Sequence, residues 1–255
     1  MIWHIYFFDI DGTLIQDGII PQSTKTTLKK LKENGHFIAI ATSRPYVLSY
    51  QQAYDLNIDN FVCDGGDGLV INRQIIEILP LNYDYCIELL KEAKQANISV
   101  AVSIDTTNYR YSQDGEFARR YLYLTDTFDF ITKEDFDINH YQTIHKICLD
   151  VTLNQEHLLP SLNKISHYRI NSRCILVEAI DKYRGIEKMV KLINGNLDEI
   201  IVFGDGLNDM KMFEQAPCSV AMKNGVEPLK QIATMVTEDI FEDGIQIARQ
   251  KLGLI

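Results

Sequence analysis

The two ends of the chain share one pattern, in which short apolar runs alternate with segments of helical period. The predicted strands of this pattern are residues 2–8, 37–41, 61–63, 199–203 and 218–222. The predicted helices are residues 21–34, 46–56, 185–193, 207–214, 226–232 and 242–251. Strands that are apolar throughout are typical of a parallel sheet covered on both faces, and alternation with helices indicates right-handed crossovers. The outer thirds therefore predict a Rossmann-like α/β core.

The middle of the chain has a different pattern, with two long helix candidates among strands of alternating polarity. The predicted helices are residues 84–95 and 114–124, and the predicted strands are 99–104, 109–112, 143–151, 167–170 and 174–178. Runs of strands with interspersed helices favour an α+β unit with a largely antiparallel sheet. We expect residues 1–81 and 182–255 to form the core and residues 82–181 to form an inserted domain.

Composition excludes several classes of partner. The formal net charge is −10, which argues against nucleic acid and against an anionic membrane surface, since both require a basic patch. The five cysteines include no Cys-x-x-Cys pair, so neither a disulfide framework nor a structural zinc site is indicated. No apolar stretch approaches the roughly 20 residues of a membrane span. We expect a cytoplasmic protein that is a monomer or a homodimer.

Polar residues follow the predicted core strands directly. Asp9 and Asp11 follow the first strand, Thr42 follows the second, and Asp205 and its neighbours follow the strand at 199–203. In a parallel α/β sheet, ligands bind at the carboxyl ends of the strands. These side chains are therefore predicted to converge on one crevice.

Asp9 and Asp11 are one residue apart, so the two carboxylates could act on the same substrate. One could attack phosphorus, while the other protonates the leaving oxygen and later deprotonates water. Gly12 allows the tight turn by which the chain leaves the sheet. The alternative interpretation is an Asp-Gly turn that only ends a strand.

A second acidic cluster lies in the loop that follows residue 203. Asp205 and Asp209 supply hard oxygen ligands of the kind that Mg²⁺ prefers, and Asp9 could complete the set. A cation is also needed because a phosphate would otherwise be repelled by the carboxylates. The alternative is that Asp205 is only the N-cap of the helix that begins at Leu207.

Residues 7–14 and 202–210 together resemble the first and fourth motifs of the haloacid dehalogenase superfamily of phosphohydrolases. The arrangement resembles its Cof-type branch (type IIB), in which a large α/β cap is inserted after the third core strand. The resemblance implies that Asp9 is the nucleophile and Asp11 the general acid/base. It implies a Mg²⁺ site formed by the Asp9 carboxylate, the Asp11 carbonyl and Asp205, with Asp209 and Asn208 supporting the phosphate and the metal's waters.

The second motif of this superfamily is a Thr or Ser that holds the transferred phosphoryl group, and residues 41–45 match it with Thr42. Ser43 stands where relatives often have Gly. A further departure lies at residues 63–68, where Gly65 replaces an Asn common in relatives, so specificity could differ. The predicted phosphate contacts are Gly12, Thr42, Ser43, Arg44, Lys182 and Asn208.

The third motif is a cation that neutralises the nucleophile and the phosphate. Lys182 fits a Lys-x-x-Gly-Ile pattern, and Arg184 directly precedes the same glycine. We prefer Lys182 because a compact ammonium suits a point-charge role. The other residue is expected to be a solvated charge at the start of the helix.

The inserted domain does not identify the substrate. Its basic residues could contact a second anionic group, but a solvated position is expected for each of Arg110, Arg119, Arg120, Lys146 and Arg173. The predicted function is Mg²⁺-dependent hydrolysis of a small phosphorylated metabolite, with sugar phosphates favoured by the resemblance. The alternatives are transfer of phosphate to a second sugar, as in phosphomannomutases, and a phosphosugar sensor without turnover.

Overall fold

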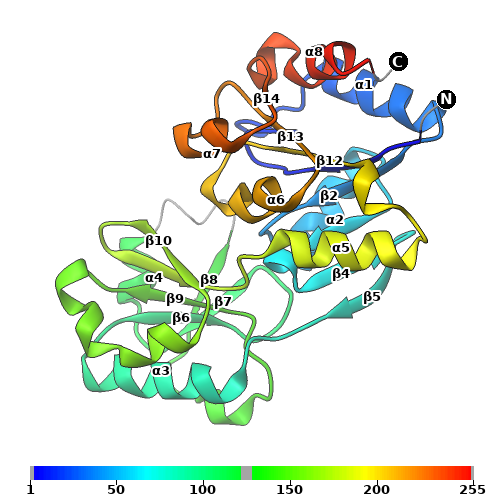
Figure 1. Cartoon of the computed structure of the whole chain (residues 1–255). Coiled ribbons are helices and arrows are strands. Elements are labelled where there is room, and N and C mark those ends of the chain that lie inside the picture. The colour runs from blue at the N-terminus through cyan, green and yellow to red at the C-terminus, as the bar shows by residue number, and fades with distance from the viewer. Residues whose placement is uncertain (1–2, 122–127, 254–255) are drawn as a thin grey trace. The chain divides into compact units, whose positions relative to one another are not determined.

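The computed structural model describes residues 3–121 and 128–253 (Figure 1). Contacts between residues divide the chain into two compact units. The first unit comprises residues 1–44, 49–77 and 181–255, and the second comprises 45–48 and 78–180. The boundaries predicted from the sequence lie within four residues of these, apart from the segment 45–48. That the second unit acts as a cap remains a prediction.

An eight-stranded sheet forms the centre of the first unit. In spatial order its strands are β14 (Met235–Val236), β13 (Cys218–Ala221), β12 (Ile200–Gly204), β1 (Ile5–Phe8), β2 (Phe37–Ala41), β3 (Phe61–Cys63), β4 (Gly68–Ile71) and β5 (Gln74–Ile78). Neighbouring strands from β14 to β3 pair in parallel, and β4 pairs with β3 antiparallel. The central strand β1 therefore has both edges paired and is buried along its whole length.

Helices cover both faces of this sheet (Figure 1). One side carries α1 (Gln22–Glu33) and α8 (Gly244–Lys251), and the other carries α5 (Lys182–Leu192) and α6 (Met210–Gln215), followed by α7 (Glu227–Ile232). Alternate residues of β1 supply the two cores, because successive side chains of a strand point to opposite faces. Ile5 and Phe7 belong to the cluster that packs against α5, α6 and α7. The remaining helix of this region is α2 (Tyr46–Asp55).

The second unit contains a six-stranded sheet with mainly antiparallel pairing. In spatial order its strands are β10 (His167–Asn171), β11 (Cys174–Val177), β9 (Lys146–Asp150), β6 (Val100–Ser103), β7 (Tyr109–Ser112) and β8 (Asp129–Thr132). Its helices are α3 (Tyr83–Gln95) and α4 (Glu116–Arg120). The predicted fold class, a parallel α/β core with an inserted α+β unit, is confirmed.

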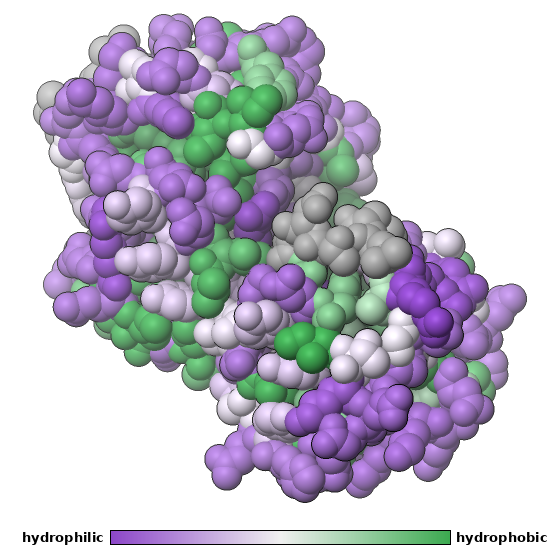
Figure 2. Space-filling model, turned by 180° about the vertical axis from the view of Figure 1, so that it is seen from behind, coloured by the Kyte–Doolittle hydropathy of each residue, from purple (hydrophilic) through white to green (hydrophobic). Residues whose placement is uncertain are grey.

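Short 3₁₀ turns complete the described secondary structure. They are η1 (Asp64–Gly66), η3 (Ile138–His140), η4 (Leu153–Leu158), η5 (Pro160–Lys164), η6 (Leu197–Glu199), η7 (Leu207–Asp209) and η8 (Ile240–Glu242). Much of the surface shown in Figure 2 is hydrophilic, and its exposed apolar residues form separate groups. Among the described residues, no helix combines the length and apolar character needed to cross a membrane.

Several predicted boundaries were wrong. The helix predicted at 185–193 begins at Lys182, because the Asp181 side chain accepts the Arg184 N–H at 3.2 Å and so caps the first turn. The helix predicted at 207–214 starts as the 3₁₀ turn η7. Strands β4, β5, β8 and β14 were missed. Residue 2 of the first predicted strand and residues 122–124 of a predicted helix lie outside the described residues.

Two glycines allow the start of α5 to lie directly against the turn that follows β3. A Cβ on Gly66 (φ +113°) would overlap the carbonyl oxygen of Asp181. A Cβ on Gly185 would lie 2.5 Å from Cγ1 of Val62 and 3.0 Å from the Gly66 carbonyl oxygen. The close approach of the backbones at Gly66 and Gly185 therefore sets the position of the start of α5, and with it the position of Lys182.

Substitution of Gly185 by Ala tests this contact. In an exposed helix, Gly→Ala stabilises by about 1 kcal/mol. Here the methyl group has no space, and overpacking costs about 1–3 kcal/mol, so a net loss of unfolding free energy is expected. Urea denaturation followed by the fluorescence of Trp3, the single tryptophan, measures it in the unit that contains α5. Lys191→Ala, on the exposed side of α5, is the control; equal stability of Gly185→Ala and wild type would contradict the packing argument.

Candidate active site

Asp9 lies at the carboxyl end of β1 and is almost completely buried. Its N–H donates to the Phe203 carbonyl at 2.9 Å, so the pairing of β1 with β12 continues to this residue. Asp9 is 3% exposed, whereas the side chain of Asp11 is 62% exposed. Between Asp11 and Thr13 the chain turns at Gly12 (φ +78°), where a Cβ would overlap the Asp205 carboxylate. The turn thus brings residues 7–14 into contact with residues 202–210, the two segments that resemble the first and fourth motifs.

Lys182 is the cation that reaches Asp9. Its Nζ lies 2.6 Å from Oδ1 of Asp9 and 2.6 Å from Oδ1 of Asp209, and the side chain is fully buried. Arg184 is instead largely exposed and forms an ion pair with Asp67. Helix α5 therefore presents Lys182 to the acidic cluster and Arg184 to the surface.

The loop after β12 positions two further carboxylates. Oδ2 of Asp209 accepts the N–H groups of Asp205 and Gly206, each at 3.0 Å. Asp209 is thus the residue that binds the backbone of this turn, and the alternative interpretation of Asp205 as the N-cap was wrong; Gly206 holds that position. Oδ1 of Asp205 accepts the hydroxyl of Thr13 at 3.2 Å.

Three carboxylates of this cluster could hold a metal ion. One oxygen each of Asp9, Asp205 and Asp209 lie within 4.8 Å of one another. Burial raises the pKa of Asp9 well above its ordinary value; Lys182 opposes this change, while Asp209 and Asp205 add to it. Burial, followed by the charge of Asp209, raises the pKa of Asp205 to about 7. Burial is thus the main reason why both pKa values are raised, and the neighbouring carboxylates add to it.

Burial by itself would lower the pKa of Lys182, but Asp209 and Asp9 outweigh it and raise the pKa above the ordinary value. The ammonium form of Lys182 is therefore stabilised by the carboxylates on either side of it.

The segment after β2 carries Thr42, Ser43 and Arg44, of which Ser43 contacts Asn208 and Arg44 contacts Asp11. Thr42 is 1% exposed, and its Oγ1 accepts the Arg44 N–H at 3.1 Å. The Asn208 amide donates to the Ser43 hydroxyl at 3.4 Å, which links the segment that matches the second motif to the segment that resembles the fourth. Arg44 forms a two-pronged ion pair with Asp11. All predicted site residues lie in the first unit.

Two residues that sequence reasoning missed complete the arrangement. Thr13 bonds Asp205 as described, and Nδ2 of Asn224 donates to the Gly12 carbonyl at 2.8 Å. Asn224 follows β13, so the rule that polar residues at strand ends converge would have found it. The N–H of Gly12 donates to the Ile15 carbonyl at 2.8 Å, and contact of Gly12 with phosphate stays a prediction.

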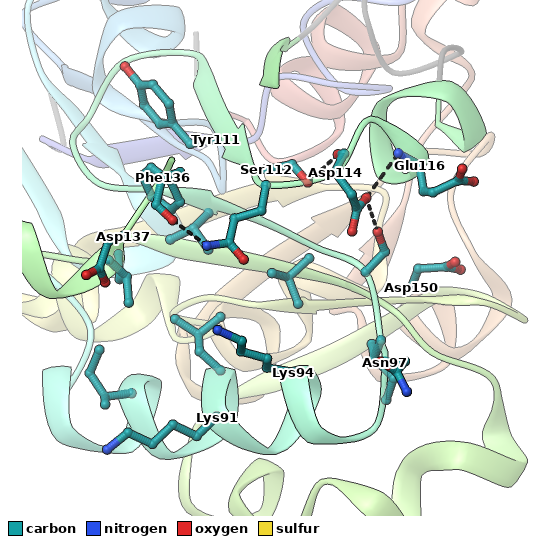
Figure 3. A pocket seen from close by; sticks show the side chains of 18 of the residues that line it. Lys91, Lys94, Asn97, Tyr111, Ser112, Asp114, Glu116, Phe136, Asp137 and Asp150 are labelled. Atoms are coloured by element: carbon teal, nitrogen blue, oxygen red, sulfur yellow. Dashed lines mark hydrogen bonds between the residues drawn. The ribbon is translucent and has the colours of Figure 1, made fainter. Parts of the chain in front are cut away.

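The second unit contains a cavity of about 660 Å³ between α3 and strands β6 and β7 (Figure 3). None of the predicted site residues lines it. Acidic side chains at its border already have partners: Asp114 accepts the Ser99 hydroxyl at 2.6 Å, and Asp150 pairs with Arg173 at 3.1 Å. No residue of the acidic cluster around Asp9 lines this cavity.

Two basic residues of the second unit are not solvated, contrary to prediction. Arg110 is 2% exposed and Lys146 is 3% exposed. Lys146 pairs with Glu178 at 2.5 Å, and Nη1 of Arg110 lies 2.5 Å from Sγ of Cys148. Both residues lie on strands, where inward-facing positions alternate with outward ones, and sequence alone did not assign the face.

Comparison with known sequences identifies relatives over nearly the whole chain. The family model of haloacid dehalogenase-like hydrolases matches residues 6–248. The protein YkrA of Bacillus subtilis (strain 168) is 30% identical over 260 residues, which cover 98% of each chain. In the same organism, the 5-amino-6-(5-phospho-D-ribitylamino)uracil phosphatase YitU is 26% identical over 266 residues, 95% of this chain and 94% of YitU.

Solved structures share the fold over the same length. The sugar phosphatase BT4131, described as subclass IIB of this superfamily, aligns with a TM-score of 0.81 and 26% identity, covering 99% of this chain and all of that one. A hypothetical protein from Geobacillus kaustophilus HTA426 aligns with a TM-score of 0.87 and 25% identity, covering 99% of each chain. The superfamily predicted from the motifs is confirmed: the chain belongs to the haloacid dehalogenase-like hydrolases.

Proposed function

We propose that the chain is a Mg²⁺-dependent phosphomonoesterase that forms an aspartyl-phosphate on Asp9 and acts on a small phosphorylated metabolite. The observation that carries this proposal is the buried carboxylate of Asp9, held by Lys182 beside Asp205 and Asp209 at the carboxyl edge of the sheet. A nucleophile needs such a fixed position close to a balancing cation.

Charge in the cluster supports a divalent cation. With Asp9, Asp205 and Asp209 ionised and Lys182 protonated, three negative charges and one positive charge leave a net −2. Carboxylate oxygens are the ligands that Mg²⁺ prefers, so we assign the metal to these three residues, with the Asp11 carbonyl as a further ligand. When bound, Mg²⁺ supplies positive charge for the oxygens of the phosphate.

In the proposed reaction, the Asp9 carboxylate attacks phosphorus in line while the bond to the alcohol oxygen breaks, and Asp11 gives that oxygen its proton. Water then attacks the aspartyl-phosphate, Asp11 takes up a proton from it, and the bond between phosphorus and Asp9 breaks. Because Thr42 Oγ1 accepts the Arg44 N–H, its own hydroxyl proton is free to point at a phosphoryl oxygen. Lys182 balances charge beside the reacting atoms.

For the substrate we propose a phosphate carried on a polyhydroxylated carbon chain. YitU is named for a phosphorylated ribitylamino-uracil, and BT4131 is described as a sugar phosphatase. Both relatives are about a quarter identical to this chain over nearly its full length, which supports the class of substrate.

Phosphate release from hexose, pentose, pentitol and nucleotide monophosphates tests the function. Release with Mg²⁺ is expected, and both chelator and Asp9→Asn should abolish it, because the amide cannot act as the nucleophile. No release from any compound by folded protein with Mg²⁺ would favour phosphotransfer or binding without turnover.

Substitution of the two candidate cations in the first turn of α5, Lys182 and Arg184, separates their roles. Lys182→Ala is expected to lower kcat by about 10²–10³, as does loss of one electrostatic contact to a transition state. Arg184→Ala, which removes only a surface ion pair, is expected to keep nearly wild-type kcat. Steady-state kinetics checks this, with Trp3 fluorescence as the control for folding. A large loss in Arg184→Ala alone would assign the role to Arg184.

Removal of the Asp205 carboxylate tests the metal site. Without metal, the pKa of Asp205 is about 7, above the value of about 3.9 for a free Asp. Its ionisation therefore lowers the stability of the metal-free protein as pH rises from about 4 to 7. Asp205→Asn removes this loss of stability and also removes a metal ligand. At pH 8 the variant should therefore have a higher Tm than wild type in chelator, and Mg²⁺ should raise its Tm by less.

Thermal denaturation with chelator and with Mg²⁺ measures both effects. Asp198→Asn, which removes a carboxylate at an exposed position of the same unit, is the matched control and should gain as much from Mg²⁺ as wild type. An equal Mg²⁺-dependent rise in all three proteins would exclude Asp205 as a ligand.

A further inference from the structure

Arg44 holds the carboxylate of Asp11 by both of its oxygens. Nε lies 2.8 Å from Oδ2, and Nη2 lies 2.6 Å from Oδ1. A planar guanidinium and a carboxylate joined in this parallel way fix both the distance and the plane of the carboxylate. The sequence predicted Arg44 as a phosphate contact, but in the structure its fork is occupied by Asp11.

Arg44 is the anchored partner of this pair. Its N–H donates to Oγ1 of Thr42 at 3.1 Å, and its carbonyl accepts the Asp64 N–H at 2.9 Å and the Ser49 hydroxyl at 3.1 Å. Its side chain is 22% exposed, against 62% for that of Asp11. The backbone of Arg44 is thus fixed by three neighbours, while Asp11 lies on an exposed turn.

We propose that Arg44 is a positioning residue that orients Asp11 for proton transfer, and that it is not a ligand of the transferred phosphate. This role rests on the function proposed above. An exposed carboxylate without a partner rotates among several rotamers, whereas general acid–base catalysis requires a fixed approach to the proton. Each oxygen that accepts one N–H keeps a second lone pair for a proton from water.

The segment from Thr42 to Arg44 also links Asp11 to Thr42, the residue proposed to hold the phosphate. Thr42 and Arg44 are two residues apart and joined by the hydrogen bond from the Arg44 N–H to Thr42 Oγ1. A displacement of Arg44 would therefore move the Asp11 carboxylate relative to the phosphate held by Thr42. Arg44 sets the position of the proton-transfer group relative to the phosphoryl group.

Arg44→Ala separates positioning from phosphate binding when p-nitrophenyl phosphate is the substrate. Nitrophenolate leaves without protonation, so formation of the aspartyl-phosphate should stay fast, whereas its hydrolysis still needs Asp11 as a base. We expect a burst of one nitrophenolate per active site and a steady-state rate lower by about 10². The Kd for the substrate, measured from the dependence of the burst rate on substrate concentration, should be unchanged. With an alkyl phosphate the burst should disappear, because that leaving group needs the acid.

A double-mutant cycle with Asp11→Asn completes the test, since residues that act through one contact are not additive. The variant with both substitutions should be no slower than Asp11→Asn alone, and Arg44→Lys, which keeps the charge without the fork, should lie between wild type and Arg44→Ala. A raised Kd for the substrate together with loss of the burst would overturn the proposal and make Arg44 a phosphate ligand. An additive cycle would also overturn it. Wild-type protein without Asp9-dependent nitrophenolate release would count against the proposed function itself.

Discussion

The site depends on one buried ammonium group. Lys182 is fully buried and lies 2.6 Å from both Asp9 and Asp209, so a single cation holds together carboxylates from the ends of two different strands. Removing one partner of a buried ion pair is strongly destabilising, because the other charge stays buried without compensation. The glycines at 66 and 185 matter for this reason: they allow α5 to come close enough to deliver Lys182.

Two electrostatic environments distinguish the two aspartates that begin the site. Asp9 is enclosed, fixed by Lys182 and close to two other carboxylates. Asp11, two residues later, is exposed and held by a guanidinium. Carboxylates with different surroundings take different chemical roles: the enclosed one suits attack on phosphorus, and the exposed one has access to water and to a leaving group.

The sequence was sufficient to predict which residues meet, because apolar strands followed by polar residues specify the carboxyl edge of a parallel sheet. Asp9, Thr42, Asp205 and Asp209 were found in this way, and Asn224 could have been. Side-chain partners could not be predicted, since they depend on geometry across strands. The contact between Arg44 and Asp11 is one example. The sequence favoured Lys182 over Arg184 from the chemistry of the two side chains alone, and only the structure shows the contact of Lys182 with Asp9.

The order of strands in the sheet has a consequence for synthesis of the protein. Strand β1 pairs on one side with β2 and on the other with β12, and Lys182 is 173 residues away from Asp9 in the chain. A ribosome therefore delivers the entire second unit before it delivers Lys182, Asp205 and Asp209, which complete the charged cluster around Asp9. Until then one edge of β1 has no partner, and the aspartate that follows it has no cation. Chain closure across such a long separation is slow, so Asp9 meets its charged neighbours late in folding, and a chain that ends before residue 182 has Asp9 without Lys182, Asp205 and Asp209.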